Sequence, residues 1–333
     1  MNQKPRVSVF IPSYNHAVYI GEAIESVLGQ TLGDFELIIV DDGSTDNSWE
    51  LIERYAKSDS RIIAIRQENQ GPSAATNRAL SQAKGDFIAA HTSDDRSIST
   101  RLEKQVAFLD AHAEYDAVAS FIEGIDGNGQ IYMGGQYEIW FNVLVDLNNP
   151  SSWVWNNRVA SPTLMLRRGF FERYGFYDRD LIHTQDWEMW IRALSIGGKF
   201  GILPEKLLQY RSHGDNLTQK DATKLFWEYA YISSKTLHPW LMGTGSDSLV
   251  LGNIVGFLRH EVFIQLNQNE RDALASILIH NFRGTFRDFF LSRNDDRANH
   301  RIEAKVIEAY GQMELEGAQL RAEGAQLRAE GAQ

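Results

Sequence analysis

Continuous apolar runs alternate with helical patterns over about the first 120 residues. Val7–Ile11 and Phe35–Val40 consist almost entirely of apolar residues, which is typical of strands covered on both faces. Tyr19–Leu28, between them, carries its apolar residues at helical spacing, and short runs at Ile62–Ile65 and Phe87–Ala90 predict two more strands. This alternation predicts an α/β fold with a mostly parallel central sheet and flanking helices.

The pattern changes beyond this point. Asp126–Gly129 has the composition of a hairpin turn, and strand-like segments return at Thr163–Leu166 and Leu207–Tyr210. The following residues carry helical patterns without strand signals, for example at Leu249–Phe263. We therefore expect three parts, namely an α/β domain over residues 1–215, a helical region over 216–310 and a tail over 311–333.

The tail is a heptad repeat. The sequence EGAQLRA occurs at Glu316–Ala322 and again at Glu323–Ala329, and a third copy is cut short. Heptads predict a coiled coil, but one large apolar residue and one glycine in each make this a weak one. A polar tail and an oligomerising helix both remain open, and we hypothesise that the natural chain continues beyond residue 333.

Charge and composition exclude several classes of protein. Lys and Arg number 33 against 44 Asp and Glu, so the net charge is −11 and binding to nucleic acid is disfavoured. The sequence has no cysteine, which excludes disulfides, thiolate metal sites and a cysteine nucleophile. Apolar runs are too short for a membrane span or a signal-peptide core. We expect a cytoplasmic protein, and leave open peripheral attachment to the inner face of a membrane.

Acidic pairs directly follow two of the expected strands. Asp41 and Asp42 end the second strand, Asp94 and Asp95 follow the fourth, and Tyr14 follows the first. In an open parallel sheet, ligands bind beyond the carboxyl ends of the strands. Clustered carboxylates need a cation, and these oxygen ligands suit Mn²⁺ or Mg²⁺ held together with substrate phosphates. None of the loops has the glycine spacing of a dinucleotide fingerprint or a P-loop.

These residues carry a family resemblance. VSVFIPSYN, DDGSTD, GDFIAAHTSDD and TQDWEMWIRA occur in the order in which inverting family-2 glycosyltransferases with the GT-A fold have them, and the similarity spans about residues 5–215. The resemblance implies a metal-dependent enzyme that moves a sugar from a nucleoside diphosphate, UDP being favoured, to a hydroxyl group with inversion. The implied acceptor is a saccharide or glycolipid, in the setting of bacterial surface polysaccharide synthesis.

For the nucleotide, the resemblance implies four contacts. Pro12 and Tyr14 are similar to the residues at the base, where the tyrosine ring stacks on uracil. Asp42 corresponds to the carboxylate that accepts a hydrogen bond from the base, with Asp41 beside it. Asp-Gly-Ser is also a common turn sequence, so each aspartate could instead serve the turn alone.

For the chemistry, the resemblance implies five further residues. Asp94 meets the ribose or the sugar, and Asp95 ligates the metal that bridges the diphosphate. Asp186, at the start of an expected helix, corresponds to the general base that takes the proton of the acceptor hydroxyl. Arg211 and His213 resemble the segment that closes over the diphosphate, so we expect Arg211 at a phosphate and His213 at the metal.

The sequence departs from the family pattern at three positions. Ser93 stands where an aspartate often begins the D-x-D motif. Thr76 stands where an arginine usually precedes the asparagine that is Asn77 here, and Gln185 stands where a glutamate commonly precedes the general base. Two other functions remain open, a sugar nucleotidyltransferase and a non-catalytic subunit that binds sugar nucleotides. The loop Pro-Ser-Tyr-Asn disfavours the first because it lacks the basic, glycine-rich character that triphosphate binding needs.

Overall fold

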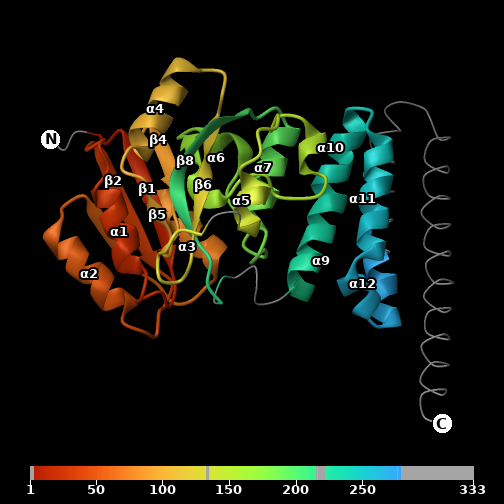
Figure 1. Cartoon of the computed structure of the whole chain (residues 1–333), viewed down its shortest axis with the longest axis horizontal. Helices are drawn as coiled ribbons and strands as arrows, with labels where there is room; N and C mark the ends of the chain where they lie inside the picture. The colour runs from red at the N-terminus through yellow and green to blue at the C-terminus, as the bar shows by residue number, and fades with distance from the viewer. Residues whose placement is uncertain (1–3, 133–134, 215, 217–221, 276, 279–333) are drawn as a thin grey trace, which may run out of the picture. The chain divides into compact units, whose positions relative to one another are not determined.

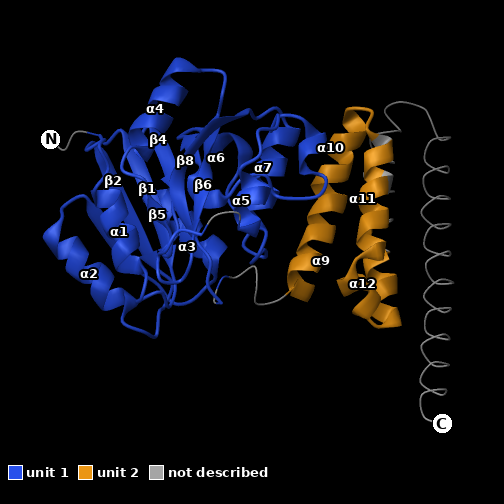
Figure 2. Ribbon diagram, viewed as in Figure 1, with its two compact units in different colours: residues 1–220 blue, residues 221–333 orange. Residues whose placement is uncertain are grey.

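The computed structural model describes residues 4–132, 135–214, 216, 222–275 and 277–278. The chain forms two compact units, residues 1–220 and 221–333 (Figure 2). The heptad tail expected over 311–333 lies outside the described residues.

Strands and helices alternate through the first part of unit 1, as the hydrophobic pattern predicts. The elements are β1 (Val7–Ser13), α1 (Ile20–Leu28), β2 (Phe35–Asp41), α2 (Ser48–Ser58), β3 (Ile62–Arg66), α3 (Pro72–Gln82) and β4 (Phe87–Ala90) (Figure 1). Every residue of β2 is buried, and so is every residue of β4, because these strands are covered on both faces.

The second part of unit 1 is less regular. Its elements are β5 (Arg96–Ser97), α4 (Arg101–Ala111), β6 (Ala117–Ile125), α5 (Gln136–Phe141), the 3-10 turns Pro150–Trp153 and Ser161–Thr163, β7 (Met165–Arg167), α6 (Phe170–Tyr174), α7 (Gln185–Ser195) and β8 (Phe200–Arg211). The expected hairpin forms after β6, where the amide of Asp126 donates to Gln130 O at 2.9 Å.

One sheet of eight strands organises the unit, in the order β3-β2-β1-β4-β7-β6-β8-β5. Four of the seven neighbouring pairs are parallel, so the α/β prediction is confirmed and the sheet is mixed. β7 is responsible for most of the mixing, because it runs antiparallel to both β4 and β6. The parallel register sets the ends of β1 and β2 side by side, with Ser13 opposite Asp41.

Unit 2 is helical in its described part. It contains α9 (Ala222–Ile232), the π-helical turn Ser233–Leu237, α10 (His238–Gly243), α11 (Asp247–Arg259) and α12 (Glu261–Gln265). The helical pattern expected over Leu249–Phe263 forms two helices that meet at His260, whose backbone is extended and whose Nδ1 accepts from the amide of Val262 at 3.2 Å. No helix among the described residues has the length and apolar character that a membrane crossing requires.

A buried histidine makes the stability of unit 2 depend on pH. Burial lowers the pKa of His238 to about 4, against a smaller opposing effect of its hydrogen bond to Asn253 Oδ1 at 2.8 Å. The neutral form is favoured in the folded unit, so the stabilisation is complete above the unfolded pKa of about 6.5 and is lost as pH falls towards 4. We expect His238→Gln, which cannot titrate, to lose less melting temperature than wild type between pH 7 and pH 4.5. Thermal unfolding followed by circular dichroism checks this, and equal losses would contradict it.

Candidate active site

The residues expected at a nucleotide base meet where β1 and β2 end. Pro12 lies opposite Val40 in the sheet, and the amide of Asp42 donates to Ser13 O at 2.8 Å. Tyr14 follows directly, and 44% of it is exposed, which leaves its ring accessible to a flat ligand.

Both carboxylate oxygens of Asp42 accept hydrogen bonds from other residues of the protein. Its Oδ1 accepts from Gln67 Nε2 at 2.7 Å and from the amide of Gln70 at 3.0 Å, and its Oδ2 accepts from the amide of Gly71 at 2.8 Å. Asp42 therefore holds the loop that leads into α3, and this geometry does not favour the contact with a base that the resemblance implies for it.

The two carboxylate oxygens of Asp41, in contrast, have different surroundings. Its Oδ2 accepts from the amide of Ser44 at 3.2 Å and lies 3.3 Å from Arg66 Nε. Its Oδ1 is buried and has no hydrogen-bond partner among the residues that the structure describes. A buried carboxylate oxygen without a donor is costly. Of the two aspartates, Asp41 is therefore the one with an acceptor oxygen that the described residues leave unused.

The second acidic pair also divides into two roles. Asp95 is 2% exposed; its Oδ1 accepts from the amide of Arg211 at 2.8 Å, and its Oδ2 contacts Thr92 Oγ1. Burial, and then the charge of Asp94, raise the pKa of Asp95 well above its ordinary value. Asp94 behaves differently, because its hydrogen bond to His213 and neighbouring histidine charges outweigh the effect of burial and lower its pKa.

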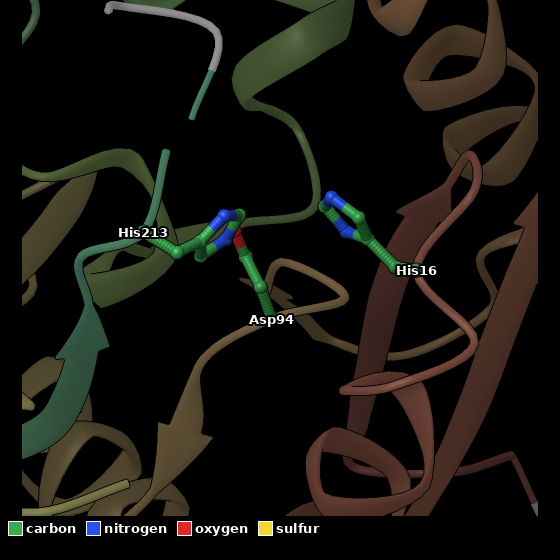
Figure 3. Close-up of side chains that lie close together, drawn as sticks. All are labelled: His16, Asp94 and His213. Carbon is green, nitrogen blue, oxygen red and sulfur yellow. The ribbon is translucent and has the colours of Figure 1, made fainter. Parts of the chain in front are cut away.

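Two histidines approach Asp94 from other segments. Asp94 Oδ2 lies 3.1 Å from His213 Nε2, and one ligand atom each of His16, Asp94 and His213 lies within 4.8 Å of the other two (Figure 3). Sequence reasoning expected Asp95 to ligate a metal with His213, and the structure places Asp94 beside His213 instead. Imidazole nitrogen together with carboxylate oxygen suits a first-row divalent ion such as Mn²⁺, so these residues fit the implied metal.

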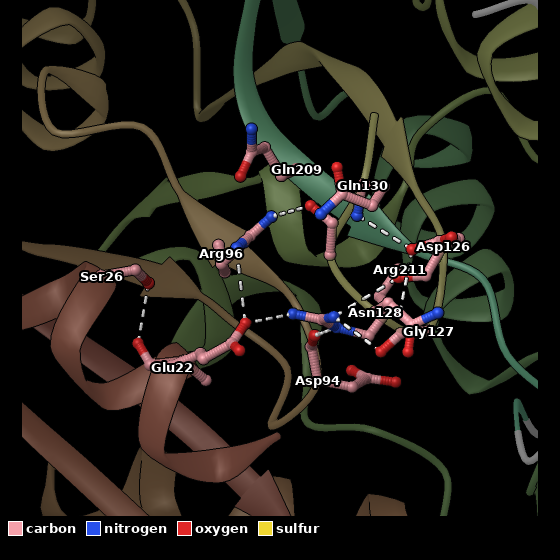
Figure 4. A network of polar contacts seen from close by, with 12 residues as sticks. Glu22, Ser26, Asp94, Arg96, Asp126, Gly127, Asn128, Gln130, Gln209 and Arg211 are labelled. Atoms are coloured by element: carbon pink, nitrogen blue, oxygen red, sulfur yellow. Dashed lines mark hydrogen bonds and ion pairs between the residues drawn. The ribbon is translucent and has the colours of Figure 1, made fainter. Parts of the chain in front are cut away.

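Arg211 is buried and bonded to three segments of the protein. Its Nη2 donates to Glu22 Oε2 at 2.5 Å, its Nε to Asp94 O at 2.7 Å, and its Nη1 to Gly127 O at 3.1 Å and Asp126 O at 3.3 Å (Figure 4). Only 1% of its side chain is exposed. We call residues 92–95, which contain Asp94 and Asp95, the acidic loop. This geometry favours a role for Arg211 in holding that loop in place, rather than the direct phosphate contact that the resemblance implies.

Asp186 lies in the first turn of α7. Its Oδ2 accepts from Asn157 Nδ2 at 3.0 Å and its Oδ1 from the amide of Trp187 at 2.7 Å. Sequence reasoning did not find Asn157, because the stretch around it has no periodic pattern. Trp187 and Trp190, one turn apart on α7, are both buried. Their packing fixes the helix that carries the carboxylate of Asp186.

The phenol of Tyr210 is affected by the charges of three of the expected site carboxylates. Burial raises the pKa of Tyr210 well above its ordinary value, and the charges of Asp95, Asp94 and Asp186 raise it further. The charges of all three carboxylates therefore reach the same phenol.

The family follows from a direct comparison of the sequence. Residues 8–175 match the sequence model of the family described as "Glycosyl transferase family 2". The chain belongs to glycosyl transferase family 2. An uncharacterized glycosyltransferase of Methanocaldococcus jannaschii is 34% identical over 239 residues, which cover 70% of this chain and 79% of the relative.

One further relative of this family-2 glycosyltransferase and one solved structure of similar fold are informative. TuaG of Bacillus subtilis, a putative teichuronic acid biosynthesis glycosyltransferase, is 44% identical over 109 residues, which cover 32% of this chain and 43% of TuaG. The crystal structure of Staphylococcus aureus TarS 1–349 in complex with UDP-GlcNAc has a TM-score of 0.65 and 19% identity, covering 92% of this chain and 89% of that one. This likeness confirms the GT-A fold.

Proposed function

We propose that this glycosyltransferase moves a sugar from a UDP-sugar to a hydroxyl of a saccharide or glycolipid acceptor, with inversion and with a divalent metal. The single observation that carries the proposal is the carboxylate of Asp94, which follows β4, lies 3.1 Å from His213 and has His16 nearby. This cluster provides metal-binding groups for the diphosphate, and Asp186 supplies the proton acceptor that a single displacement requires. TuaG, named for teichuronic acid biosynthesis, supports surface polysaccharide synthesis as the setting, and TarS, crystallised with UDP-GlcNAc, supports a UDP-sugar as the donor.

The proton and the new bond are accounted for by this chain's own residues. Asp186 takes the proton of the acceptor hydroxyl as its oxygen attacks the anomeric carbon, and the bond from that carbon to the diphosphate breaks on the opposite face. Asn157 and the amide of Trp187 hold the carboxylate in the orientation that receives the proton. No covalent intermediate with the protein is needed, and the configuration at the anomeric carbon is inverted.

The metal ion is expected beside the diphosphate of the donor. Asp94 and His213 would hold a divalent ion, which when bound supplies positive charge beside the leaving diphosphate. Asp95 and Arg211 keep the acidic loop in position through their hydrogen bonds to Thr92, to the backbone and to Glu22. In this proposal Asp95 supports the metal ligand rather than replacing it.

The base is recognised at Asp41 and Tyr14. Uracil carries an N3–H group that donates to the buried Oδ1 of Asp41, whereas the corresponding nitrogen of cytosine accepts hydrogen bonds. The exposed ring of Tyr14 stacks on the base, and Pro12 lies in the adjoining strand. The pairing of donor and acceptor therefore favours UDP over CDP.

A single substitution at Asp41 tests this assignment. In Asp41→Asn the amide oxygen remains directed at the donors of Ser44 and Arg66, so an NH₂ group replaces Oδ1. We expect UDP affinity to fall about tenfold or more, because a hydrogen bond to a charged group is lost, and the preference for UDP over CDP to narrow or reverse. Isothermal titration with both nucleotides and Mn²⁺ measures this.

Asp110→Asn provides the matched control, since it makes the same charge change at a half-exposed site that pairs with Arg6. Its UDP affinity is expected to equal that of wild type. An unchanged preference for UDP in Asp41→Asn would remove Asp41 from the base site. If wild type bound no nucleoside diphosphate at all, with or without Mn²⁺, the proposed function itself would fail.

A further inference from the structure

In the acidic loop of this enzyme, a serine stands where the family pattern often has a carboxylate, and a histidine lies beside it. Ser93 occupies the position where a carboxylate often begins the metal-binding motif, and its side chain is 3% exposed. Ser93 Oγ lies 2.6 Å from Nδ1 of His16. The hydroxyl therefore orients an imidazole at the place where the family pattern supplies an aspartate.

The backbone around His16 is built to hold that imidazole. Among the residues that the structure describes, Asn15 is the one non-glycine residue with a positive φ, 52°. Its backbone amide donates to Ser44 Oγ at 2.9 Å, and its Oδ1 accepts from the amide of Thr45 at 2.8 Å. The amide of His16 donates to Ser48 Oγ at 2.9 Å. A left-handed turn fixed by three hydrogen bonds thus directs His16 towards the acidic loop.

Aromatic packing holds the second imidazole. The ring of Tyr19 lies 4.7 Å from that of His213 and 6.1 Å from that of His16, centroid to centroid, and the guanidinium of Arg211 covers Tyr19 at 4.9 Å. The two imidazoles are themselves 5.8 Å apart and almost perpendicular. Both rings therefore have restricted orientations before any ion binds.

The three candidate atoms are near enough to share an ion once their side chains move. Ligand atoms at about 2.1 Å from one ion, at angles of about 90–109° to each other, are about 3.0–3.4 Å apart. The three candidate atoms lie within 4.8 Å of one another, so the widest pair would need to close by up to about 1.8 Å. Binding of one ion by all three residues therefore requires a movement of the histidine side chains.

We propose that His16 is a third protein ligand of the metal, and that His16, Asp94 and His213 form a two-histidine, one-carboxylate site that prefers Mn²⁺ to Mg²⁺. The inference rests on the proposed function, because the metal would serve the same diphosphate. Its physical basis is that imidazole nitrogen binds transition ions well, whereas Mg²⁺ prefers oxygen ligands and water. Ser93, by orienting His16, acts as a positioning residue for the ligand.

The number of imidazole nitrogens bound to the metal can be measured by spectroscopy, without an assay of sugar transfer. Electron spin echo modulation of Mn²⁺ bound to the full-length protein with UDP is expected to show two coupled imidazole nitrogens in wild type and one in His16→Gln. We also expect His16→Gln to lower Mn²⁺ affinity about tenfold or more, on the scale found for groups that support metal ligands, and to change Mg²⁺ affinity far less. His112→Gln, on a half-exposed histidine beside Glu114, is the control and should match wild type.

A reciprocal variant tests the exchange of ligands. In His16→Gln combined with Ser93→Asp, the carboxylate that the family pattern has at this position returns, and we expect affinity for Mg²⁺ to rise relative to Mn²⁺. A single coupled nitrogen in wild type, or unchanged Mn²⁺ affinity in His16→Gln, would overturn the role of His16 while leaving the proposed function intact. Failure of wild type to bind Mn²⁺ in the presence of UDP would overturn both.

Discussion

Asparagine in place of Asp186 is expected to lower sugar transfer by about 10²- to 10⁴-fold, the range that a positioned general base contributes. The amide is nearly the same size as the carboxylate and keeps an oxygen for the Asn157 hydrogen bond, but it cannot take the proton of the acceptor hydroxyl. Binding of UDP should be unchanged, because the proposed function places Asp186 at the acceptor hydroxyl and not at the nucleotide. Release of UDP from UDP-sugars in the presence of acceptor, together with titration of UDP, separates the two quantities.

Asp180→Asn is the matched control for this experiment. Asp180 is exposed, precedes α7 by a few residues and makes the same change of charge, so transfer should equal that of wild type. Full activity of Asp186→Asn would exclude Asp186 as the general base. A sugar nucleotidyltransferase would behave differently, since it would form pyrophosphate from a sugar phosphate and a nucleoside triphosphate and would release no UDP from a UDP-sugar.

The regular part of the fold could be predicted because its signals are local. β2 is a run of buried residues that needs no knowledge of its neighbours, and α1 shows its buried face in its own spacing. β8 was expected only over Leu207–Tyr210, but it begins at Phe200. A bulge opposite Ser120 and Phe121, together with the exposed residues Pro204–Lys206, interrupts the alternation by which a strand is found.

The site could be located from the sequence but not resolved into roles. Strand ends predict that Asp41 and Asp94 share one edge, because parallel register is a property of the whole sheet. The distinction between Asp41 and Asp42 depends on the loop at Gln67–Gly71, which folds back across the sheet edge. Arg211 reaches Glu22 across 189 positions of the chain, and no spacing rule in the sequence encodes such a contact.

In the proposed function Asp94 binds the metal, whereas Asp95 supports the acidic loop. In Asp94→Asn the charge facing His213 is lost, so we expect Mn²⁺ affinity in the presence of UDP and the rate of transfer each to fall about 10²-fold or more. Asp95→Asn should be much milder, because Asp95 is buried and its carboxylate oxygens contact the amide of Arg211 and the hydroxyl of Thr92. An asparagine oxygen can accept from the amide of Arg211 while its NH₂ donates to Thr92.

The comparison decides between two assignments of the metal ligand. If Asp94 is the ligand, Asp95→Asn keeps Mn²⁺ affinity close to that of wild type and its melting temperature changes little. If Asp95 is the ligand, as the family resemblance implies, the order of the two variants is reversed and Asp95→Asn loses the metal. Paramagnetic titration of Mn²⁺ into both variants with UDP present gives the order directly. The geometry favours the first outcome, because Asp95 is enclosed by Thr92 and the backbone of Arg211 whereas Asp94 is the carboxylate that faces both histidines.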